Sequence, residues 1–512
     1  MNGIGGIVNG IPCEEMLAQI KGVGQYVSPQ ACLFGSPKPV MGTLGLQTYV
    51  GVCDGELYNK DDLVKELHPL GYRFADRSDA AVLLHSYMAW GIGCLEKLTG
   101  VFAFAIWDGE RLTLARDRMG YKPLLYGMGI NGLIFASSIK TILCHPGIKP
   151  TLTQQGVAEL MLLGPYRTPG CGILKGINEL RPGHCLVYRT GNTPQIKCYW
   201  RPQAKPRADD LATTVKTVRG LLADAVKSQT QSGGKYVIGT GEPESSILAS
   251  LAGVRTVSAQ DAVCSDEWAD ALTPATEALG FPACDADAVF WLRCKQLREA
   301  SPAVLSGEGA DTIFGSHPWY TNDKWSASVR QRLPFIRHGA LGRIDPEEYV
   351  RARFDETINA ASVRYDDEPT DKRIRQMTCL TLQWYLPILL TRIERMSDAV
   401  GLTVRLPFLD HRLADYMYNV PWAMKNHGDN DKGLLREAFK GIKADPPTPA
   451  TPNPSFLRKL QDMMREMINT PNSPLFEIVD RERVKSLASP QTLAYFLGIN
   501  AWLERFSINI SL

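Results

Sequence analysis

The chain has 512 residues and a formal net charge of +2, and this length predicts two globular domains. The near-neutral charge disfavours a nucleic-acid or membrane surface, and the sequence lacks the run of about 18 apolar residues that a transmembrane helix requires. The N-terminus has no signal-peptide pattern. The 12 cysteines form no C-x-x-C pair, so we expect a cytoplasmic protein with free thiols and no zinc site.

Residues 1–200 predict an α+β domain of packed sheets. A helix is expected from Asp79 to Trp90, and it should end there because Gly91 and Gly93 break the pattern. Buried strands are expected in the short apolar runs at residues 101–107, 112–116 and 133–136. The first run is closed by an Asp-Gly dipeptide, which is typical of a hairpin turn.

Residues 210–512 predict a second domain. The polar stretch 201–209 contains two prolines and is typical of a linker, and Asp210 is the expected N-cap of the following helix. Strand and helix signals then alternate, with strands expected at residues 235–238, 254–258 and 303–305. This alternation predicts an α/β fold with a parallel sheet, whose ligands bind at the carboxyl ends of the strands. From residue 330 onward the pattern is mostly helical.

Five motifs occur in a fixed order along the chain. They are Asp-Gly-Glu-Leu-Tyr-Asn at 54–59, Ala-Arg-Asp-Arg-Met-Gly-Tyr-Lys-Pro at 115–123, Arg-Thr-Pro-Gly at 167–170 with Arg-Pro-Gly-His at 181–184, Ser-Gly-Glu-Gly-Ala-Asp at 306–311, and Arg-Leu-Pro-Phe-Leu-Asp-His at 405–411. Together they resemble the asparagine synthetase family. The resemblance implies an Ntn-type amidotransferase-like domain of packed antiparallel sheets, followed by a PP-loop ATP pyrophosphatase domain. It also implies ATP and Mg²⁺ as cofactors, and activation of a carboxylate as an acyl-adenylate that an amine attacks.

The glutamine-hydrolysing site that the resemblance implies lacks its nucleophile. The family uses an N-terminal cysteine, whose thiolate attacks glutamine, whereas this sequence has Asn2. The oxyanion-binding stretch begins with Asp54, and a carboxylate there would repel a developing oxyanion. Residues 35–46 include no arginine to hold glutamine. Asp79 does match the acid that holds the substrate amine, although it also fits a first-turn helix acid. We predict a structural domain without glutaminase activity.

The phosphate-binding loop of the second domain is partly preserved. Glycines in such a loop leave backbone N–H groups free to bind phosphate. Glu242 and Pro243 depart from the family pattern by adding a negative charge and removing an N–H. The loop is therefore either remodelled but functional or decayed. The residues that match nucleotide-binding positions are Ile238, Thr240, Gly241, Ser245, Ser246, Ala259, Ser306 and Gly307.

The resemblance also assigns metal-binding and catalytic residues. Glu244 replaces a magnesium-binding aspartate and keeps its charge, and Asp311 matches the second acid, so the two would suffice for Mg²⁺ with phosphate oxygens. Glu308 matches a glutamate that takes the proton of the attacking amine. Lys432 matches a lysine that offsets charge on the acyl oxygen and phosphate. Glu394 is either a second carboxylate near Glu308 or a salt-bridged helix residue.

We expect a small, amino-acid-like substrate. A homodimer is compatible with the sequence. Aspartate is in doubt, because residues 285–292 add bulk where the family binds its amino acid. The favoured hypothesis is an intramolecular amide synthetase similar to the β-lactam synthetases of antibiotic and toxin biosynthesis, which also lack the cysteine, although Glu308 departs from that group. The alternatives are an intermolecular ligase using ammonia or another amine, a lasso-peptide-type cyclase, and a non-catalytic subunit.

Overall fold

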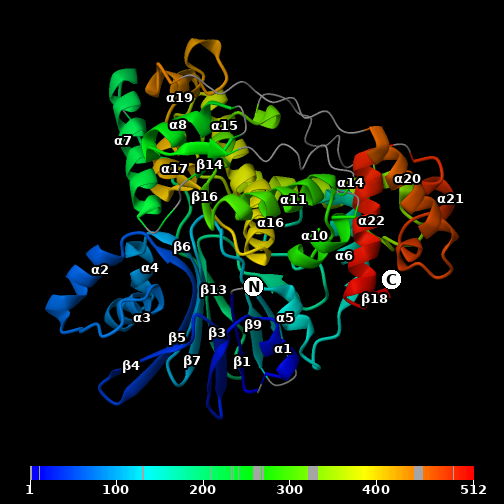
Figure 1. Cartoon of the computed structure of the whole chain (residues 1–512), viewed down its shortest axis with the longest axis horizontal. Coiled ribbons are helices and arrows are strands. Elements are labelled where there is room, and N and C mark those ends of the chain that lie inside the picture. Colours follow the sequence, from blue (N-terminus) through cyan, green and yellow to red (C-terminus); the bar gives the residue numbers. More distant parts are fainter. Residues whose placement is uncertain are drawn as a thin grey trace. The chain divides into compact units, whose positions relative to one another are not determined.

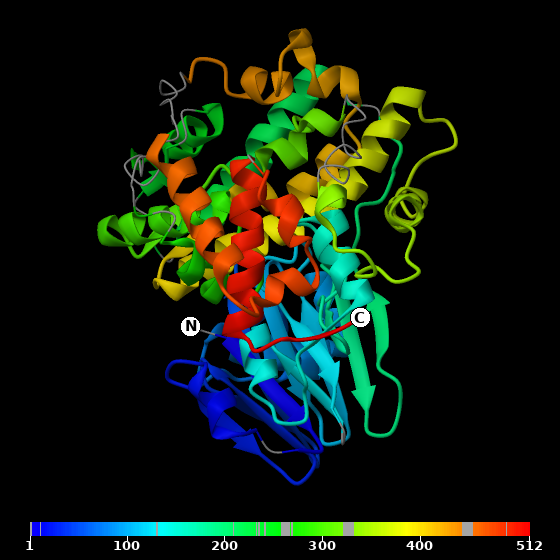
Figure 2. The same ribbon diagram turned by 90° about the vertical axis from the view of Figure 1, so that its right-hand side faces the viewer.

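The computed structural model describes residues 3–10, 12–129, 132–207, 209–231, 233, 236–239, 242–257, 267, 270–320, 332–442, 454–487 and 489–512. The chain divides into two units (Figures 1 and 2). Unit 1 comprises Met1–Thr153, Pro169–Arg201 and Phe506–Ser511, and unit 2 comprises Gln154–Thr168, Pro202–Arg505 and Leu512. The segment Gln154–Thr168 therefore belongs to unit 2, although the chain on both sides of it belongs to unit 1.

Unit 1 contains two six-stranded antiparallel sheets, as the sequence predicts. The first sheet has the order β11 (Ile177–Glu179), β8 (Leu125–Met128), β9 (Leu133–Ala136), β1 (Gly3–Val8), β3 (Ala31–Ser36) and β2 (Gly24–Val27). The second has the order β13 (Gln195–Cys198), β12 (His184–Arg189), β7 (Arg111–Arg116), β6 (Gly100–Trp107), β5 (Gln47–Leu57) and β4 (Val40–Leu44). A parallel pair, β10 (Thr151–Thr153) and β18 (Asn509–Ser511), joins the last strand to this unit.

Strand β6 shows how unit 1 builds its core. Successive side chains of a strand point to opposite faces. Ala103 and Ala105 accordingly lie in the apolar core between the two sheets, whereas Phe104 and Ile106 pack against helices on the other face. Both faces of β6 are thus buried, which explains its uninterrupted apolar sequence.

Helices cover the outer face of the second sheet, as Figure 1 shows for α2, α3 and α4. The predicted helix is confirmed as α3 (Asp79–Trp90), and it begins where the Ser78 side chain accepts a hydrogen bond from Ala81 N at 3.3 Å. The other helices of unit 1 are α1 (Glu14–Ala18), α2 (Lys60–Leu67), α4 (Cys94–Lys97) and α5 (Ile139–Leu143).

Unit 2 is built around a four-stranded parallel sheet, which confirms the predicted α/β fold. Its order is β15 (Arg255–Val257), β14 (Tyr236–Ile238), β16 (Ala303–Leu305) and β17 (Thr403–Arg405). The helices described in this unit are α6 (Gln154–Ala158), α7 (Leu211–Thr230), α8 (Pro243–Ala252), α10 (Leu272–Leu279), α11 (Asp285–Ala300), α12 (Ala310–Phe314), α14 (Pro346–Asn359), α15 (Pro369–Leu380), α16 (Leu386–Ala399), α17 (His411–Tyr418), α18 (Trp422–Lys425), α19 (Gly433–Ala438), α20 (Pro454–Asn469), α21 (Arg481–Val484) and α22 (Pro490–Arg505).

Asp210 caps α7 as predicted, because its side chain accepts a hydrogen bond from Thr213 N at 2.8 Å. Among the described helices, none combines the length and the apolarity that crossing a bilayer requires.

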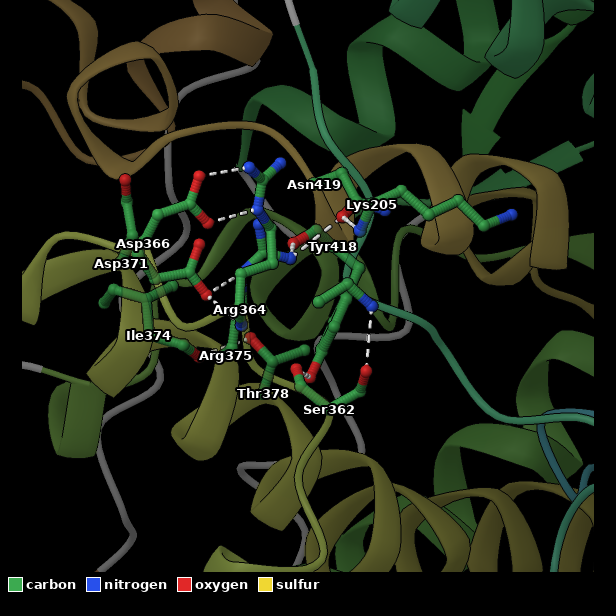
Figure 3. Close-up of polar contacts among 12 residues, drawn as sticks. Lys205, Ser362, Arg364, Asp366, Asp371, Ile374, Arg375, Thr378, Tyr418 and Asn419 are labelled. Atoms are coloured by element: carbon green, nitrogen blue, oxygen red, sulfur yellow. Dashed lines mark hydrogen bonds and ion pairs between the residues drawn. The ribbon is translucent and has the colours of Figure 1, made fainter.

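Side-chain contacts fix the linker segment to the rest of unit 2 (Figure 3). Asn419 is central, since its Oδ1 accepts hydrogen bonds from Lys205 N at 2.7 Å and from the Arg375 guanidinium at 2.9 Å. Arg375 in turn forms a buried ion pair with Asp367 at 3.0 Å. Ser362 accepts a further bond from Ala204 N at 3.0 Å. These contacts attach the start of the second unit to the middle of α15, to the C-terminal end of α17 and to Ser362 between α14 and α15.

The buried Arg116 guanidinium organises the turn that follows β7. It donates to the main-chain carbonyls of Gly120, Lys122 and Leu180, each at 2.8 Å. It also forms an ion pair with Glu179 at 2.7 Å, and both side chains are almost fully buried. The position of β11, which carries Glu179, therefore depends on an ion pair that water does not screen.

We expect Glu179→Gln to destabilise the protein by about 3 kcal/mol, because the buried guanidinium loses its counter-charge. Calorimetric or urea unfolding of the full chain measures this loss. Glu110→Gln is the matched control, since Glu110 faces Arg189 in an exposed pair at 4.0 Å and should change stability by no more than about 0.5 kcal/mol. Equal effects of the two substitutions would contradict the prediction.

Candidate active site

Three charged residues meet beyond the carboxyl ends of β14 and β16. The Lys432 ammonium lies 2.5 Å from Glu244 Oε1 and 2.8 Å from Asp311 Oδ1. Glu244 stands in the first turn of α8, after β14, and Asp311 stands in the first turn of α12, after β16. Parallel strands bring their carboxyl ends to one edge of the sheet, so two residues 67 positions apart in sequence (311 − 244) share one lysine.

The backbone at Lys432 directs its side chain to the two acids. Lys432 adopts a left-handed conformation, with φ of 53°, immediately before α19. The next residue, Gly433, lies against His427, where a Cβ would stand 2.0 Å from the His427 carbonyl oxygen. A larger residue at 433 would therefore push α19 and its preceding lysine away. The position of Lys432 is consequently set by packing at its neighbour as well as by charge.

The surroundings of Glu244 suit a metal cation in addition to the Lys432 ammonium. The residue is 4% exposed, and its Oε2 is buried without a hydrogen bond from any described residue. A buried carboxylate oxygen without a donor is unfavourable, and a metal ion would satisfy it. Within the described ranges no cluster of three or more His, Cys, Asp or Glu residues has metal-site geometry. The pair Glu244 and Asp311 fits Mg²⁺, which commonly takes one or two carboxylates and completes its shell with phosphate oxygens and water.

The phosphate-binding loop is described in part. Thr240, Gly241 and Ala259 lie outside the described residues, whereas Ile238 ends β14. Pro243 occupies the first position of α8, where a helix has no hydrogen-bond acceptor for an N–H in any case. Glu242 precedes it and is exposed, which keeps its charge at the surface. Ser245 and Ser246 follow in the first turn of α8, whose N-terminus favours anions.

Ser306 and Gly307 bring the second strand end against α8. Ser306 N donates to the Arg405 carbonyl at 2.9 Å, and Ser306 Oγ accepts from Glu308 N at 3.2 Å. A Cβ at Gly307 would lie 2.7 Å from Glu244 Cβ, closer than real side chains approach. The site therefore requires glycine at 307, because that close contact places Glu244.

Glu308 lies beside the three-residue cluster with an altered acidity. The residue is exposed. Partial desolvation by the surrounding protein raises the pKa of its carboxyl group, and the charges of Asp311 and Glu244 raise it further. Arg293 and Lys432 oppose this shift. A carboxylate with a raised pKa is a better proton acceptor near neutral pH.

Arg293, on α11, is a site residue that the sequence did not identify. Its charge acts on Glu308, and burial lowers the pKa of its guanidinium. No sequence motif marks it. The added bulk of residues 285–292, where the family binds its amino acid, was the one signal that could have directed attention there.

Glu394 is placed differently from Glu308. It is 2% exposed within α16 and lies 3.4 Å from Arg395, its neighbour in sequence. The neighbouring Arg392 instead forms an ion pair with Asp287 of α11 at 2.9 Å. Glu394 therefore has a charged partner within its own helix.

In unit 1, ion pairs engage the acidic residues of the expected glutamine-hydrolysing site. Asn2 lies outside the described residues. The Asp54 carboxylate is buried and lies 2.8 Å from the Lys122 ammonium. Asp79 accepts a hydrogen bond from Leu57 N at 3.0 Å and lies 3.4 Å from Lys60. Both carboxylates that the sequence comparison singled out therefore have partners within the unit.

Gly307→Ala should disrupt the site, because the added methyl group must displace Glu244. We expect a destabilisation of about 1–3 kcal/mol from overpacking and a smaller rise in melting temperature when ATP and Mg²⁺ are added. Gly220→Ala is the control, since a Cβ there meets nothing within 4 Å and alanine favours the helix. Unaltered stabilisation by ATP and Mg²⁺ in Gly307→Ala would show that the close contact does not place Glu244.

Comparison with known proteins agrees with this geometry. Residues 39–200 match a glutamine amidotransferase domain model, and residues 236–504 match an asparagine synthase model. "Asparagine synthetase [glutamine-hydrolyzing] 3" of Bacillus subtilis is 33% identical, over 93% of this chain and 90% of its own length. "Asparagine synthetase [glutamine-hydrolyzing] 1" of the same species is 23% identical over 77% of this chain and 74% of its own, and "Amidase chry2" of Gibberella zeae is 24% identical over the same shares. The chain belongs to the asparagine synthetase family, whose members are ATP-dependent amide ligases.

Proposed function

We propose that this protein is an ATP- and Mg²⁺-dependent synthetase that adenylates a carboxylate and closes an amine of the same substrate molecule onto it, without hydrolysing glutamine. The observation that carries the proposal is the meeting of Lys432, Glu244 and Asp311 beside Glu308. A merely structural relative would have no need of two carboxylates and a lysine at the nucleotide end of the sheet. The cofactors fit the residues present, because Glu244 and Asp311 would hold Mg²⁺ against the phosphates of ATP.

The proposed reaction has two steps. A substrate carboxylate oxygen attacks the α-phosphorus of ATP, and pyrophosphate leaves. The amine nitrogen then attacks the acyl carbon, AMP departs with the electron pair of the broken C–O bond, and the amine loses one proton. ATP supplies the activated leaving group, and bound Mg²⁺ would neutralise phosphate charge.

The protein's own residues have distinct tasks in this scheme. Glu308 accepts the proton of the attacking amine, and its raised pKa suits that task near neutral pH. Lys432 turns from its two acids toward the phosphate and acyl oxygens as negative charge develops there. Before nucleotide binds, the same lysine neutralises Glu244 and Asp311, whose mutual repulsion would otherwise open the site.

The residues of unit 1 support an amine source other than glutamine hydrolysis. The sequence has Asn2 in place of a cysteine, and Asp54 and Asp79 are engaged by Lys122 and Lys60. An amine carried on the substrate itself needs no ammonia source, and its effective concentration at the acyl carbon is high. The competing proposal is an intermolecular ligase that uses free ammonia or another amine, and the activity named for the B. subtilis relative, glutamine-hydrolysing asparagine synthesis, favours an intermolecular reaction.

Glu308→Gln and Lys432→Ala should separate the two steps. Glutamine at 308 cannot accept a proton, so amide formation should fall at least about 100-fold, while ATP–pyrophosphate exchange continues. Lys432→Ala should abolish both activities, because charge stabilisation is lost in both steps. Exchange and AMP release with candidate amino acids measure the two steps.

The control for these variants is Lys440→Ala, an exposed lysine whose partner Glu437 lies 3.7 Å away. It should leave both activities unchanged. Full amide formation in Glu308→Gln would remove Glu308 from the proposed role.

Ammonium and glutamine distinguish the sources of the amine. We expect glutamine to yield no glutamate, since Asn2 stands where the family has its nucleophilic cysteine. Added ammonium should leave product formation unchanged, because a tethered amine outcompetes it. Mass spectrometry of the product and a glutamate assay provide the measurements. Faster product formation with ammonium would favour the intermolecular ligase instead.

A further inference from the structure

The Lys432 ammonium lies where a metal ion shared by Glu244 and Asp311 would have to bind. Its Nζ atom is 2.5 Å from Glu244 Oε1 and donates a hydrogen bond of 2.8 Å to Asp311 Oδ1. Because Mg²⁺ binds carboxylate oxygens at about 2.1 Å, an ion on these two oxygens would stand no more than about 5 Å from the ammonium. The lysine and the metal ion therefore compete for the same two oxygens.

Burial makes this competition strong. The side chains of Lys432 and Glu244 are 6% and 5% exposed, whereas that of Asp311 is 50% exposed. Charges that are buried in this way are screened little by salt and water, so an ammonium and a divalent ion repel each other there. Glu244 Oε2 has no donor among the described residues and can contact a metal ion while Oε1 holds the lysine. A metal ion that also takes Asp311 must displace the ammonium.

The lysine can leave the acids only by rotation of its side chain, because hydrogen bonds fix the backbone on both sides of it. The Lys432 carbonyl accepts a bond from Arg436 N at 3.0 Å, within α19. Gly433 N donates to the Asn430 carbonyl at 2.9 Å. The start of α19 therefore stays in place, and the movement that frees the acids is confined to the lysine side chain.

We infer that Lys432 acts as an internal counter-ion that keeps free Mg²⁺ out of this site until a nucleotide binds. The phosphate groups of the nucleotide supply negative charge to the ammonium when it leaves Glu244 and Asp311, and a free metal ion supplies none. Without that charge the displaced ammonium would remain unpaired in a buried position, which is costly. The inference rests on the proposed function in taking Glu244 and Asp311 as the metal-binding acids, and it adds that metal and nucleotide enter together.

Metal binding in the absence of nucleotide tests this inference without requiring turnover. The probe is Mn²⁺ added to the full chain, and equilibrium dialysis measures the ion bound to protein. Lys432→Met removes the ammonium but keeps a long side chain, so the two carboxylates are left to an added cation. We expect this variant to bind Mn²⁺ at least about tenfold more tightly than the wild-type protein. Mg²⁺ should compete with Mn²⁺ for the gained site.

Further variants locate the gained site. Asp311→Asn added to Lys432→Met should abolish the gain, because one of the two carboxylates is lost. Lys432→Arg keeps a cation beside the acids and should exclude Mn²⁺ as the wild type does. The matched control is Lys122→Met, since the Lys122 ammonium lies 2.8 Å from one buried carboxylate, that of Asp54. It should gain no Mn²⁺ binding, because its removal does not leave a pair of acids.

The wild-type protein decides the question if Lys432→Met does not fold. Dialysis with β,γ-imido-ATP present on both sides of the membrane should show Mn²⁺ bound to protein at least about tenfold more tightly than dialysis without nucleotide. A Lys432→Met protein that folds only when Mn²⁺ is added would itself support the inference, because the metal would then replace the ammonium.

Two results would overturn the inference. One is an unchanged Mn²⁺ affinity in folded Lys432→Met, and the other is wild-type protein that binds Mn²⁺ as tightly without nucleotide as with it. ATP–pyrophosphate exchange by the wild type reports separately on the proposed function. Exchange together with unchanged Mn²⁺ affinity in the variant would refute the inference alone. The expected gain without any exchange would support metal exclusion by Lys432 and refute the synthetase proposal.

Discussion

The arrangement of unit 2 depends on one shared cation. Glu244 and Asp311 follow different strands, and Lys432 lies between them at 2.5 and 2.8 Å. Burial and both acids act on this lysine, and its acidic partners raise its pKa despite the burial. The lysine therefore stays charged at any physiological pH, and it holds two like charges together until a nucleotide and a metal ion can take over that task. The same three charges therefore hold the empty site together and would bind the nucleotide and its metal ion.

In unit 1, each of the two acidic residues at the expected glutaminase site has its own lysine partner. Asp54 and Asp79 are located on elements that the fold must keep, since β5 pairs along its length with β6 and α3 packs on the same sheet. Lys122 and Lys60 neutralise these carboxylates. These ion pairs hold both carboxylates within unit 1.

The sequence predicted what depends on local pattern and motif. The antiparallel sheets, α3, the cap at Asp210 and the parallel sheet follow from periodicity and turn residues, and Glu244, Asp311, Lys432 and Glu308 meet as their motifs imply. Contacts made by tertiary packing could not be read in the same way. Arg293 lies on α11, whose sequence carries no motif, and the partner of Asp54 becomes apparent only when β5 and the turn after β7 are placed together.

The segment Gln154–Thr168 has a consequence for the way this protein can be divided. The chain leaves unit 1 at residue 153, contributes Glu159 and Tyr166 to unit 2, returns at residue 169 and leaves again at residue 201, and the residues after 505 rejoin unit 1 through β18. The two units are interleaved along the polypeptide and are not arranged in tandem. A truncation at the proline-containing linker would remove this segment from the synthetase half, including Glu159, whose carboxylate accepts hydrogen bonds from Thr168 N and the Tyr349 hydroxyl. Gene fusion or exchange of either half as a module would therefore have to carry both pieces of each unit together.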